Sequence, residues 1–500
     1  MTTRNCPPSP SCILESLRGL GYTLPTALAD LIDNSISAGA TEIDVHVEWR
    51  GADSWISISD NGAGMSDAQL EAAMRLGSRS PRETRSVDDL GRFGLGLKTA
   101  SLSQGRRLTV ASKTSDGLES CLRWDLDILN RETAGSWTVY EGPADGSDAR
   151  VAQPLGRISG TVVLIENLDR ILTADFSRDD MVQLVDEVDA HLAMVFHRLI
   201  SSAVVGLKIR INGRSVRAWD PFLVGHPGKA MESTEYTLFD GSPIQVQLHV
   251  LPHRDLLSAD DFSRAAGPAG WVQQQGIYVY RNKRLLVAGG WLGLGEGGRL
   301  WTRDEQHRLA RIRVDIANGD DAEWKIDVRK SAAVPPVRLK RQLVRLARET
   351  RDAARRAFAG RGIVVDSDNR VSSKLPDPWA TVRSTSGTSY RIARDHDLVV
   401  RILERAGDLR PDILAMFRLL EETLPVQRIW VDTAEEKDTP RVGFTDAKDD
   451  DVLATLRPLF HAIIFGSKIT PDEARDRLRR TPAFSRYSHL IDILDAPTSP

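Results

Sequence analysis

The sequence predicts an α/β protein with more than one domain, and three observations support this. Apolar and polar residues alternate over 43–47, which is the period of a half-buried strand. Apolar residues recur at helical spacing over 28–32. The 500 residues exceed the size of an ordinary single domain. Strands and helices do not alternate regularly, so a doubly wound parallel sheet is not expected.

The composition narrows the class of protein. Hydrophobic residues make up 41% and charged residues 27%, which is typical of a soluble globular chain. The formal net charge of -3 excludes a chain that is basic throughout, but not a local basic stripe. The three cysteines form no CxxC pair, so a disulfide scaffold and a four-thiolate zinc site are excluded. No apolar run approaches the roughly 20 residues of a membrane span. We therefore expect a cytoplasmic protein without a membrane partner.

The predicted elements follow in chain order. Helical signals cover 10–38, and a second helix covers 180–200. Strands are expected over the following ranges: 43–47, 55–59, 107–112, 120–124, 136–140 and 160–165.

Further strands are expected in the second part of the chain, at 207–211, 276–280, 312–316 and 324–328, with turns at 212–214 and 281–284. Residues 336–359 predict a long amphipathic helix. The polar residues 365–390 predict a linker, and 391–500 predict a mostly helical domain. An acidic stretch over 432–451, with eight acids and three bases, is expected to be a loop.

The first motif that carries chemistry is on the helix around residue 30. Asp30 and Asn34 are four residues apart, so both side chains project from one face. A carboxylate can orient a water, and an amide oxygen can bind a hard cation. Asp33 is adjacent to Asn34 but turned about 100° around the helix, so it is not predicted to take part.

Three glycine-containing motifs follow. Asp60-Asn-Gly62-Ala-Gly64-Met65 comes directly after a strand, where glycines let the chain turn tightly against a flat ligand. Residues 89–101 contain Gly91, Gly94, Gly96 and Lys98 before a helix, and helix N-terminal N–H groups with a lysine favour phosphate. Gly160-Thr161 opens a buried strand. Each motif alone is also compatible with an ordinary turn or strand.

Together and in this order, the motifs resemble those of the GHKL ATPase superfamily. The resemblance rests on ADLIDNSISAGA (29–40), DNGAGM (60–65), LGRFGLGLKTASL (90–102) and GTVVL (160–164). Within the superfamily the chain is similar to prokaryotic MORC-like and MutL-like proteins, because GIYVYRNKRLL (276–286) and WKIDVRKSAAVP (324–335) resemble their transducer domain.

The resemblance implies a domain plan. Residues 1–200 would form a Bergerat-type α/β sandwich that binds ATP. Residues 201–364 would form an α/β transducer domain with a ribosomal-protein-like fold, ending in the basic helix. The tail over 391–500 resembles no known family and is expected to bind a partner.

The resemblance also implies roles for single residues. Asp60 would accept a hydrogen bond from adenine, with Thr161 behind it, Gly62 and Gly64 shaping the loop and Met65 packing on the ring. Asn34 would bind Mg²⁺. Gly91, Gly94, Gly96 and Lys98 would contact phosphate. Lys330 would reach the terminal phosphate from the transducer domain, with Lys325 as the weaker alternative. Asp30 would be the catalytic base, where the superfamily usually has Glu, so slow hydrolysis is expected.

The helix that ends the transducer region predicts a phosphate-binding surface. Residues 338–361 contain nine basic and two acidic residues, a net charge of +7. We expect Arg345, Arg348, Arg355 and Arg356 to bind DNA without sequence preference, although a solvated helix face is an equal alternative. Asp304-Glu-Gln-His307 resembles a metal-binding motif only superficially and is expected to be a surface loop.

These expectations combine into a Mg²⁺-dependent ATPase that pairs into a homodimer on binding ATP. Family resemblance suggests that it acts on DNA with a nuclease or helicase partner in a restriction-like antiphage defence system. The alternative is a chaperone-like or scaffolding protein, which uses ATP to set protein–protein contacts with little turnover.

Overall fold

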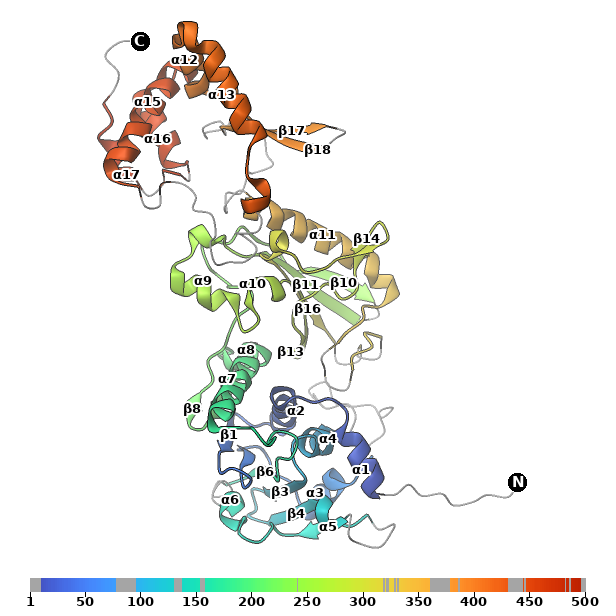
Figure 1. Cartoon of the computed structure of the whole chain (residues 1–500). Coiled ribbons are helices and arrows are strands. Elements are labelled where there is room, and N and C mark those ends of the chain that lie inside the picture. Colours follow the sequence, from blue (N-terminus) through green and yellow to red (C-terminus); the bar gives the residue numbers. More distant parts are fainter. Residues whose placement is uncertain are drawn as a thin grey trace. The chain divides into compact units, whose positions relative to one another are not determined.

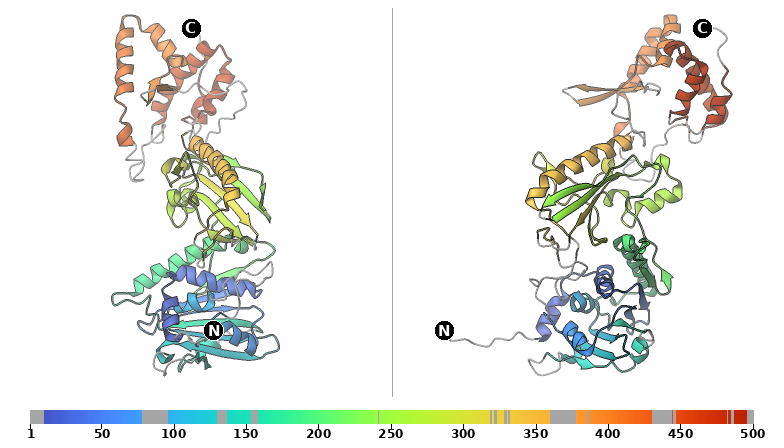
Figure 2. Two further views of the ribbon diagram at one scale, coloured as in Figure 1. Left: turned by 90° about the vertical axis from the view of Figure 1, so that its right-hand side faces the viewer. Right: turned by 180° about the vertical axis from the view of Figure 1, so that it is seen from behind.

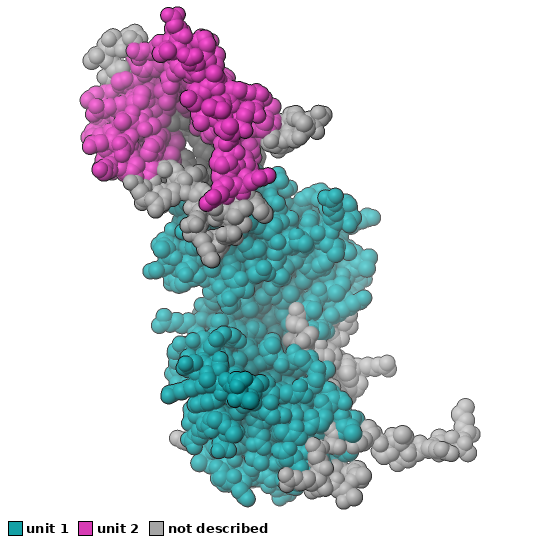
Figure 3. All heavy atoms as spheres, viewed as in Figure 1, with its two compact units in different colours: residues 1–364 teal, residues 365–500 magenta. Residues whose placement is uncertain are grey.

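The computed structural model describes a large part of the chain, which divides into two compact units, residues 1–364 and 365–500 (Figure 3). The described residues are 10–77, 96–129, 137–152, 158–240, 242–317, 320, 323–327, 330, 332–359, 378–384, 387–429, 444, 447–481, 483–484 and 487–495. The first unit contains two large sheets with separate hydrophobic cores. We call the parts around these sheets the first and the second subdomain.

The first subdomain, in the lower part of Figure 1, is built on a mixed eight-stranded sheet. Its strand order is β5-β4-β3-β6-β2-β1-β7-β8. Its strands are β1 (Glu42–Glu48), β2 (Trp55–Asp60), β3 (Arg107–Lys113), β4 (Glu119–Asp125), β5 (Tyr140–Glu141), β6 (Gly160–Glu166), β7 (Lys208–Ile211) and β8 (Arg214–Ser215). The alternation over 43–47 forms a half-buried strand, as predicted, because Ile43, Val45 and Val47 are buried.

Helices cover both faces of this sheet. On one face, α2 (Leu24–Ser37) and α7 (Arg178–Val195) lie together over the strands (Figure 2), and α4 (Gly96–Leu102) joins their core. On the other face, α6 (Asp148–Ala152) contributes Val151 to a smaller cluster. The remaining helices are α1 (Pro10–Arg18), α3 (Asp67–Met74), α5 (Leu126–Leu129) and α8 (His197–Ile200). The α/β fold class is therefore confirmed.

The first subdomain extends beyond the boundary predicted at residue 200. Strand β7 pairs in parallel with β1, and β8 pairs with β7, so both belong to the first sheet. Val216 also lies in the first core. The boundary was predicted too early because the strand signal at 207–211 does not reveal which sheet the strand joins.

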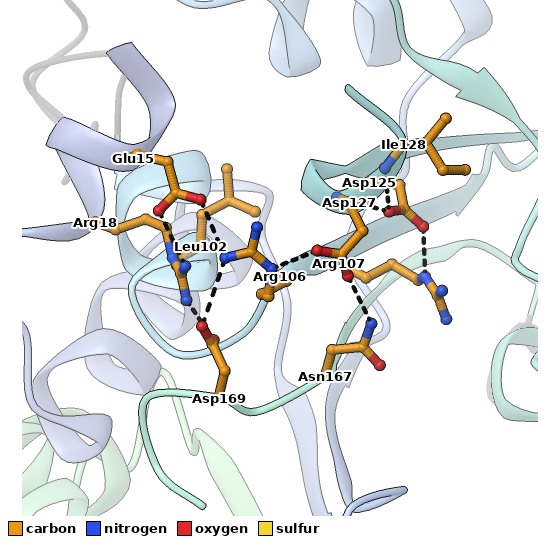
Figure 4. A network of polar contacts seen from close by, with 10 residues as sticks. All are labelled: Glu15, Arg18, Leu102, Arg106, Arg107, Asp125, Asp127, Ile128, Asn167 and Asp169. Carbon is orange, nitrogen blue, oxygen red and sulfur yellow. Dashed lines mark hydrogen bonds and ion pairs between the residues drawn. The ribbon is translucent and has the colours of Figure 1, made fainter. Parts of the chain in front are cut away.

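Helix α1 is fastened to the first subdomain by a network of polar contacts (Figure 4). The Nε of Arg18 donates to the carbonyl of Leu102 at 2.7 Å, and its guanidinium pairs with Asp169. Glu15 adds an ion pair with Arg106 at 3.0 Å. Since Leu102 ends α4, these contacts join α1 to the helix that follows residues 78–95.

The second subdomain contains a six-stranded sheet with the path β10-β11-β16-β12-β13, and β9 also pairs with β11. Its strands are β9 (Met231–Glu232), β10 (Tyr236–Asp240), β11 (Ser242–Val250), β12 (Gly276–Arg281), β13 (Arg284–Val287) and β16 (Ala310–Ile316); β14 (Gly295–Glu296) and β15 (Arg299–Leu300) form a separate hairpin. The turn between β12 and β13 has positive φ at Asn282 and Lys283, as expected for a tight hairpin.

Helices complete the second subdomain. Helix α11 (Val337–Ala359) lies across one face of the sheet (Figure 2), and α9 (Ala259–Ala266), α10 (Gly270–Gln273), η2 (Arg254–Leu256) and η3 (Glu305–His307) are shorter. The amphipathic pattern predicted for α11 is confirmed, because its apolar stripe is buried from Leu339 to Ala357. In η3 the Asp304 side chain accepts from the His307 backbone N–H, so this motif is a capped turn.

The strand predicted over 324–328 is wrong in its described part. Residues 323–325 form a turn, and Lys325 has a positive φ of 46°. Trp324 and Ile326 are buried and join the second core. The strand-like apolar pattern therefore arises because an irregular segment, not a strand, buries two side chains in the core.

The second unit begins with a hairpin of β17 (Trp379–Ser384) and β18 (Gly387–Ile392). This corrects the prediction that 365–390 is entirely linker. Its helices are α12 (Asp397–Arg405), η5 (Gly407–Leu409), α13 (Arg410–Glu422), α15 (Asp449–Ser467), α16 (Pro471–Arg479) and α17 (Ser488–Asp492). Within the acidic stretch, 432–443, 445 and 446 lie outside the described residues, whereas Asp449–Asp451 form the first turn of α15, where negative charge is favourable.

In the described part of the chain, no helix combines the length and apolarity needed to cross a membrane.

Candidate nucleotide site

The carboxylate of Asp60, at the end of β2, contacts residues of three of the predicted motifs. The Oδ1 of Asp60 accepts from the backbone N–H groups of Gly62 at 2.9 Å and Thr161 at 3.2 Å. Its Oδ2 accepts from the Ser35 hydroxyl at 2.7 Å. The carboxylate is thus held in one orientation at the junction of α2, β2 and β6.

A second set of bonds ties Met65 to the same place. The Ser112 hydroxyl accepts from the Met65 backbone N–H at 2.8 Å and lies 2.9 Å from the Thr161 hydroxyl. Met65 itself is partly buried against the first core. Ser35 and Ser112 were not predicted, and their contacts arise only when separate elements meet.

Gly64 shows why this loop needs glycine. Its φ is +75°, and a Cβ there would lie 1.9 Å from the carbonyl oxygen of Lys113. Any side chain would force the loop away from β3. The loop therefore approaches the sheet as closely as its sequence allows.

The predicted phosphate segment is partly outside the described residues. This applies to Gly91 and Gly94, whereas Gly96 begins α4. Lys98 is buried, and its Nζ donates to the carbonyls of Ala73 at 2.8 Å and Arg75 at 3.0 Å, at the end of α3. Burial lowers the pKa of the Lys98 ammonium to about 8. A phosphate contact by Lys98 would require exchange of these hydrogen bonds.

Helix α2 presents the two remaining predicted groups, Asp30 and Asn34. Asp30 is buried, and its Oδ2 accepts from the Tyr22 hydroxyl at 2.8 Å. Asn34 is exposed, and its amide has no hydrogen-bond partner among the described residues. An amide oxygen is a ligand type that Mg²⁺ takes together with phosphate oxygens and water, so Asn34 fits the predicted metal role.

Lys330 meets helix α2 from the second subdomain. Its Nζ lies 3.0 Å from the Oδ1 of Asp30 and 2.5 Å from the Oδ2 of Asp33. Lys330, which was predicted to reach the terminal phosphate from the transducer domain, thus contacts Asp30, although the two residues are 300 positions apart. Lys325 is exposed and lies in the preceding turn.

Asp33, which was not predicted to take part in the site, lies beside Asp30 and contacts Lys330. It follows Asp30 by three residues, and positions three apart share a helix face. Its side chain is 1% exposed, and the Nε of Arg284 lies 3.1 Å from both carboxylate oxygens. Burial alone would raise the pKa of Asp33, but Arg284 and Lys330 together hold this pKa below its ordinary value.

Arg284 completes a buried cluster of two cations and two carboxylates. It begins β13, and its Nη2 is 3.7 Å from the Oδ1 of Asp30. The sequence contained no local signal for this contact, because Arg284 lies in a hairpin 251 residues after Asp33. We call Asp30, Asp33, Arg284 and Lys330 the carboxylate–cation cluster.

No group of His, Cys, Asp and Glu side chains suited to hold a metal occurs among the described residues. Asn34 would bind a metal at this site together with water and the ligand's own oxygens.

Comparison with known proteins agrees with this geometry. Residues 22–151 match the family described as Histidine kinase-, DNA gyrase B-, and HSP90-like ATPase. The DNA mismatch repair protein MutL of Shewanella sediminis (strain HAW-EB3) is 29% identical over 209 residues, which are 40% of this chain and 30% of that protein. MutL of Aliivibrio salmonicida (strain LFI1238) is 28% identical over 273 residues, which are 52% of this chain and 36% of that protein.

The similarity to these curated relatives spans about a third of their length. The family match over residues 22–151 includes Asp30, Asn34 and Asp60. Residues 22–151 therefore form a GHKL-type ATPase domain, and the chain is similar to MutL proteins over part of its length.

Proposed function

We propose that this protein is a Mg²⁺-dependent ATPase that works as a conformational clamp. The observation that carries the proposal is the contact of Lys330, from the second subdomain, with Asp30 and Asp33 beside Asn34. The family match over residues 22–151 supports ATP as the ligand.

The clamp follows from competition for Lys330. Asp30 and Asp33 hold the Lys330 ammonium when no other anion is near. The terminal phosphate of ATP is a stronger negative centre, and a lysine that moves to it neutralises charge that develops during phosphoryl transfer. Because Lys330 belongs to the second subdomain, phosphate occupancy would set the angle between the subdomains.

The Mg²⁺ requirement gives a direct test of the site. Replacing Asn34 with Ala removes the predicted metal ligand but no packing, because the side chain is exposed. We expect Asn34→Ala to weaken Mg²⁺-dependent ATP binding by at least about tenfold, as is typical when a metal-site residue is lost. Titration calorimetry with and without Mg²⁺ measures this loss.

A control separates loss of the ligand from loss of the fold. Asn61→Ala alters another asparagine near the site, whose amide bonds to the backbone of residues 41 and 42. It should lower stability yet retain a Mg²⁺-dependent difference in affinity. Equal ATP affinity of wild type and Asn34→Ala in Mg²⁺ would contradict the metal role.

DNA is the client that we propose for the clamp. Arg345, Arg355 and Arg356 are exposed on α11, and no carboxylate of the described ranges lies within ion-pair distance of them. Arg348 is paired with Glu296 at 2.7 Å, and Arg351 is turned inward over Trp291. The exposed basic surface of α11 is thus smaller than the nine basic residues counted in the sequence suggest.

We expect DNA binding to depend on this surface through salt-sensitive phosphate contacts. Changing Arg345, Arg348, Arg355 and Arg356 to Gln should reduce the magnitude of the slope of log K against log salt by about 3.6, since each of the four phosphate contacts contributes about 0.9. A matched control changes four exposed arginines elsewhere, Arg178, Arg217, Arg299 and Arg405. If the α11 variant keeps the wild-type affinity for DNA and the wild-type salt slope, DNA is not the ligand on which the clamp acts.

The proposal extends to an ATP-dependent homodimer that works with a nuclease or helicase in cytoplasmic antiphage defence. Support for this step is the sequence resemblance to prokaryotic MORC-like proteins. Sedimentation with a non-hydrolysable ATP analogue tests the dimer.

One observation favours the alternative, a scaffolding protein with little turnover. Helix α13 exposes Met416, Leu419 and Leu420, each about half accessible. Such residues favour contact with another protein. If this alternative holds, the protein should bind ATP but hardly hydrolyse it. Changing Met416, Leu419 and Leu420 to Ser should then disrupt the binding of the protein partner alone.

A further inference from the structure

The two oxygens of the Asp30 carboxylate are held from different sides. Oδ2 accepts a hydrogen bond from the Tyr22 hydroxyl at 2.8 Å. Oδ1 lies 3.0 Å from the Nζ of Lys330 and 3.7 Å from the Nη2 of Arg284. One oxygen is therefore bound within the first subdomain, and the other faces cations from the second.

Tyr22 is built into the first subdomain. It lies between α1 and α2, is 9% exposed and belongs to the first core. The Nε2 of Gln104 approaches its backbone carbonyl at 3.5 Å. Burial and then the neighbouring Asp30 carboxylate raise the pKa of the Tyr22 hydroxyl well above its usual range, so it stays a donor. Its bond to Asp30 does not depend on the second subdomain.

The contact of Lys330 with Asp30 differs in this respect. It crosses between subdomains and shares the ammonium with Asp33. If the second subdomain rotates, or a phosphate attracts Lys330, Oδ1 loses this partner while Oδ2 keeps Tyr22. An aspartate carboxylate rotates about its terminal bond, and a hydrogen bond on one oxygen restricts that rotation.

We propose that Tyr22 is a positioning residue that fixes Oδ2 of Asp30, so that Oδ1 is the oxygen that accepts a proton once Lys330 has moved. This inference rests on the proposed ATPase function. In that reaction the oxygen of a water forms a bond to the terminal phosphorus of ATP. The bond from this phosphorus to the bridging oxygen breaks, ADP leaves with the electron pair, and the proton of the water passes to Oδ1.

The arrangement also bears on the presence of Asp where the superfamily usually has Glu. The shorter side chain has fewer torsions, so a single anchor determines where its second oxygen points. A catalytic base must lie within hydrogen-bond distance of its proton donor, directly or through one water. The orientation of the carboxylate therefore matters more for Asp, whose side chain is shorter than that of Glu. Tyr22 supplies that orientation from eight residues earlier in the chain.

Tyr22→Phe tests the proposal, because it removes the hydroxyl and keeps the ring. We expect kcat to fall about tenfold while KM and the ATP dissociation constant stay within about twofold, since the lost bond acts on the base and not on the nucleotide. Tyr236→Phe, in β10 of the second subdomain, is the matched control and should keep wild-type kcat and KM. Steady-state phosphate release by the full chain gives both constants.

The outcomes separate this inference from the function on which it rests. If wild type releases no phosphate, or Asp30→Asn turns over like wild type, the proposed function fails. If Asp30→Asn is inactive but Tyr22→Phe has wild-type kcat, Tyr22 does not position Asp30. If Tyr22→Phe lowers kcat/KM only because KM rises, with kcat unchanged, then Tyr22 acts in nucleotide binding and the inference is overturned.

Discussion

Asp30→Asn should abolish ATP turnover while ATP still binds. The amide has nearly the same shape as the carboxylate but cannot take a proton from water, so kcat should fall by at least about 10²-fold. ATP binding should remain within about twofold, because the adenine and metal contacts proposed for Asp60 and Asn34 are not altered. Phosphate release and fluorescent nucleotide titration measure the two quantities separately.

The fold should tolerate this change. Lys330 keeps its contact with Asp33, and the Tyr22 hydroxyl keeps an oxygen to which it can donate. Asp53→Asn, in the exposed turn between β1 and β2, is a suitable control and should retain full activity. Hydrolysis by Asp30→Asn at the wild-type rate would assign the base to another group.

Arg284→Met should cause the largest loss of stability. The Arg284 and Asp33 side chains are 4% and 1% exposed, so removal of the guanidinium leaves a buried carboxylate with Lys330 as its remaining cation. Removal of one partner of a buried ion pair costs about 3 kcal/mol or more. Chemical denaturation of the full chain, followed through the transition of the first unit, measures this loss.

Two further variants show whether the charge is responsible. Asp33→Leu combined with Arg284→Met removes both charges, and much of the stability should return, since apolar replacements of buried pairs are often tolerated. Arg214→Met breaks an exposed pair with Asp186, whose side chains are 60% and 65% exposed, and should cost less than about 1 kcal/mol. Equal losses in Arg284→Met and Arg214→Met would contradict the assigned role of burial.

The parts of the site that could be predicted from the sequence are those with local signals. Asp30 and Asn34 share a helix, and Asp60, Gly62 and Gly64 share a turn, so spacing alone indicates how each set lies. Lys330 required the family resemblance, because nothing around it points to a residue 300 positions earlier.

The contacts that were missed depend on tertiary structure. Tyr22 and Arg284 become important only through the groups they meet, and both look like ordinary core and hairpin residues in the sequence. Asp33 could have been included, since three-residue spacing places it on the face of Asp30. The segment around Trp324 has strand-like alternation but is irregular, because burial of two side chains does not require strand pairing.

The parallel pairing of β7 with β1 has a consequence for how the protein can be divided and how it is made. Strand β1 emerges from the ribosome about 160 residues before β7, and until then its outer edge has no partner in this sheet. A fragment ending at residue 200 would keep that edge permanently open, with the β-branched residues Ile43, Val45 and Val47 beside it. Such a fragment should aggregate, whereas one extended through Val216 should remain dispersed, which light scattering of the two purified fragments can distinguish.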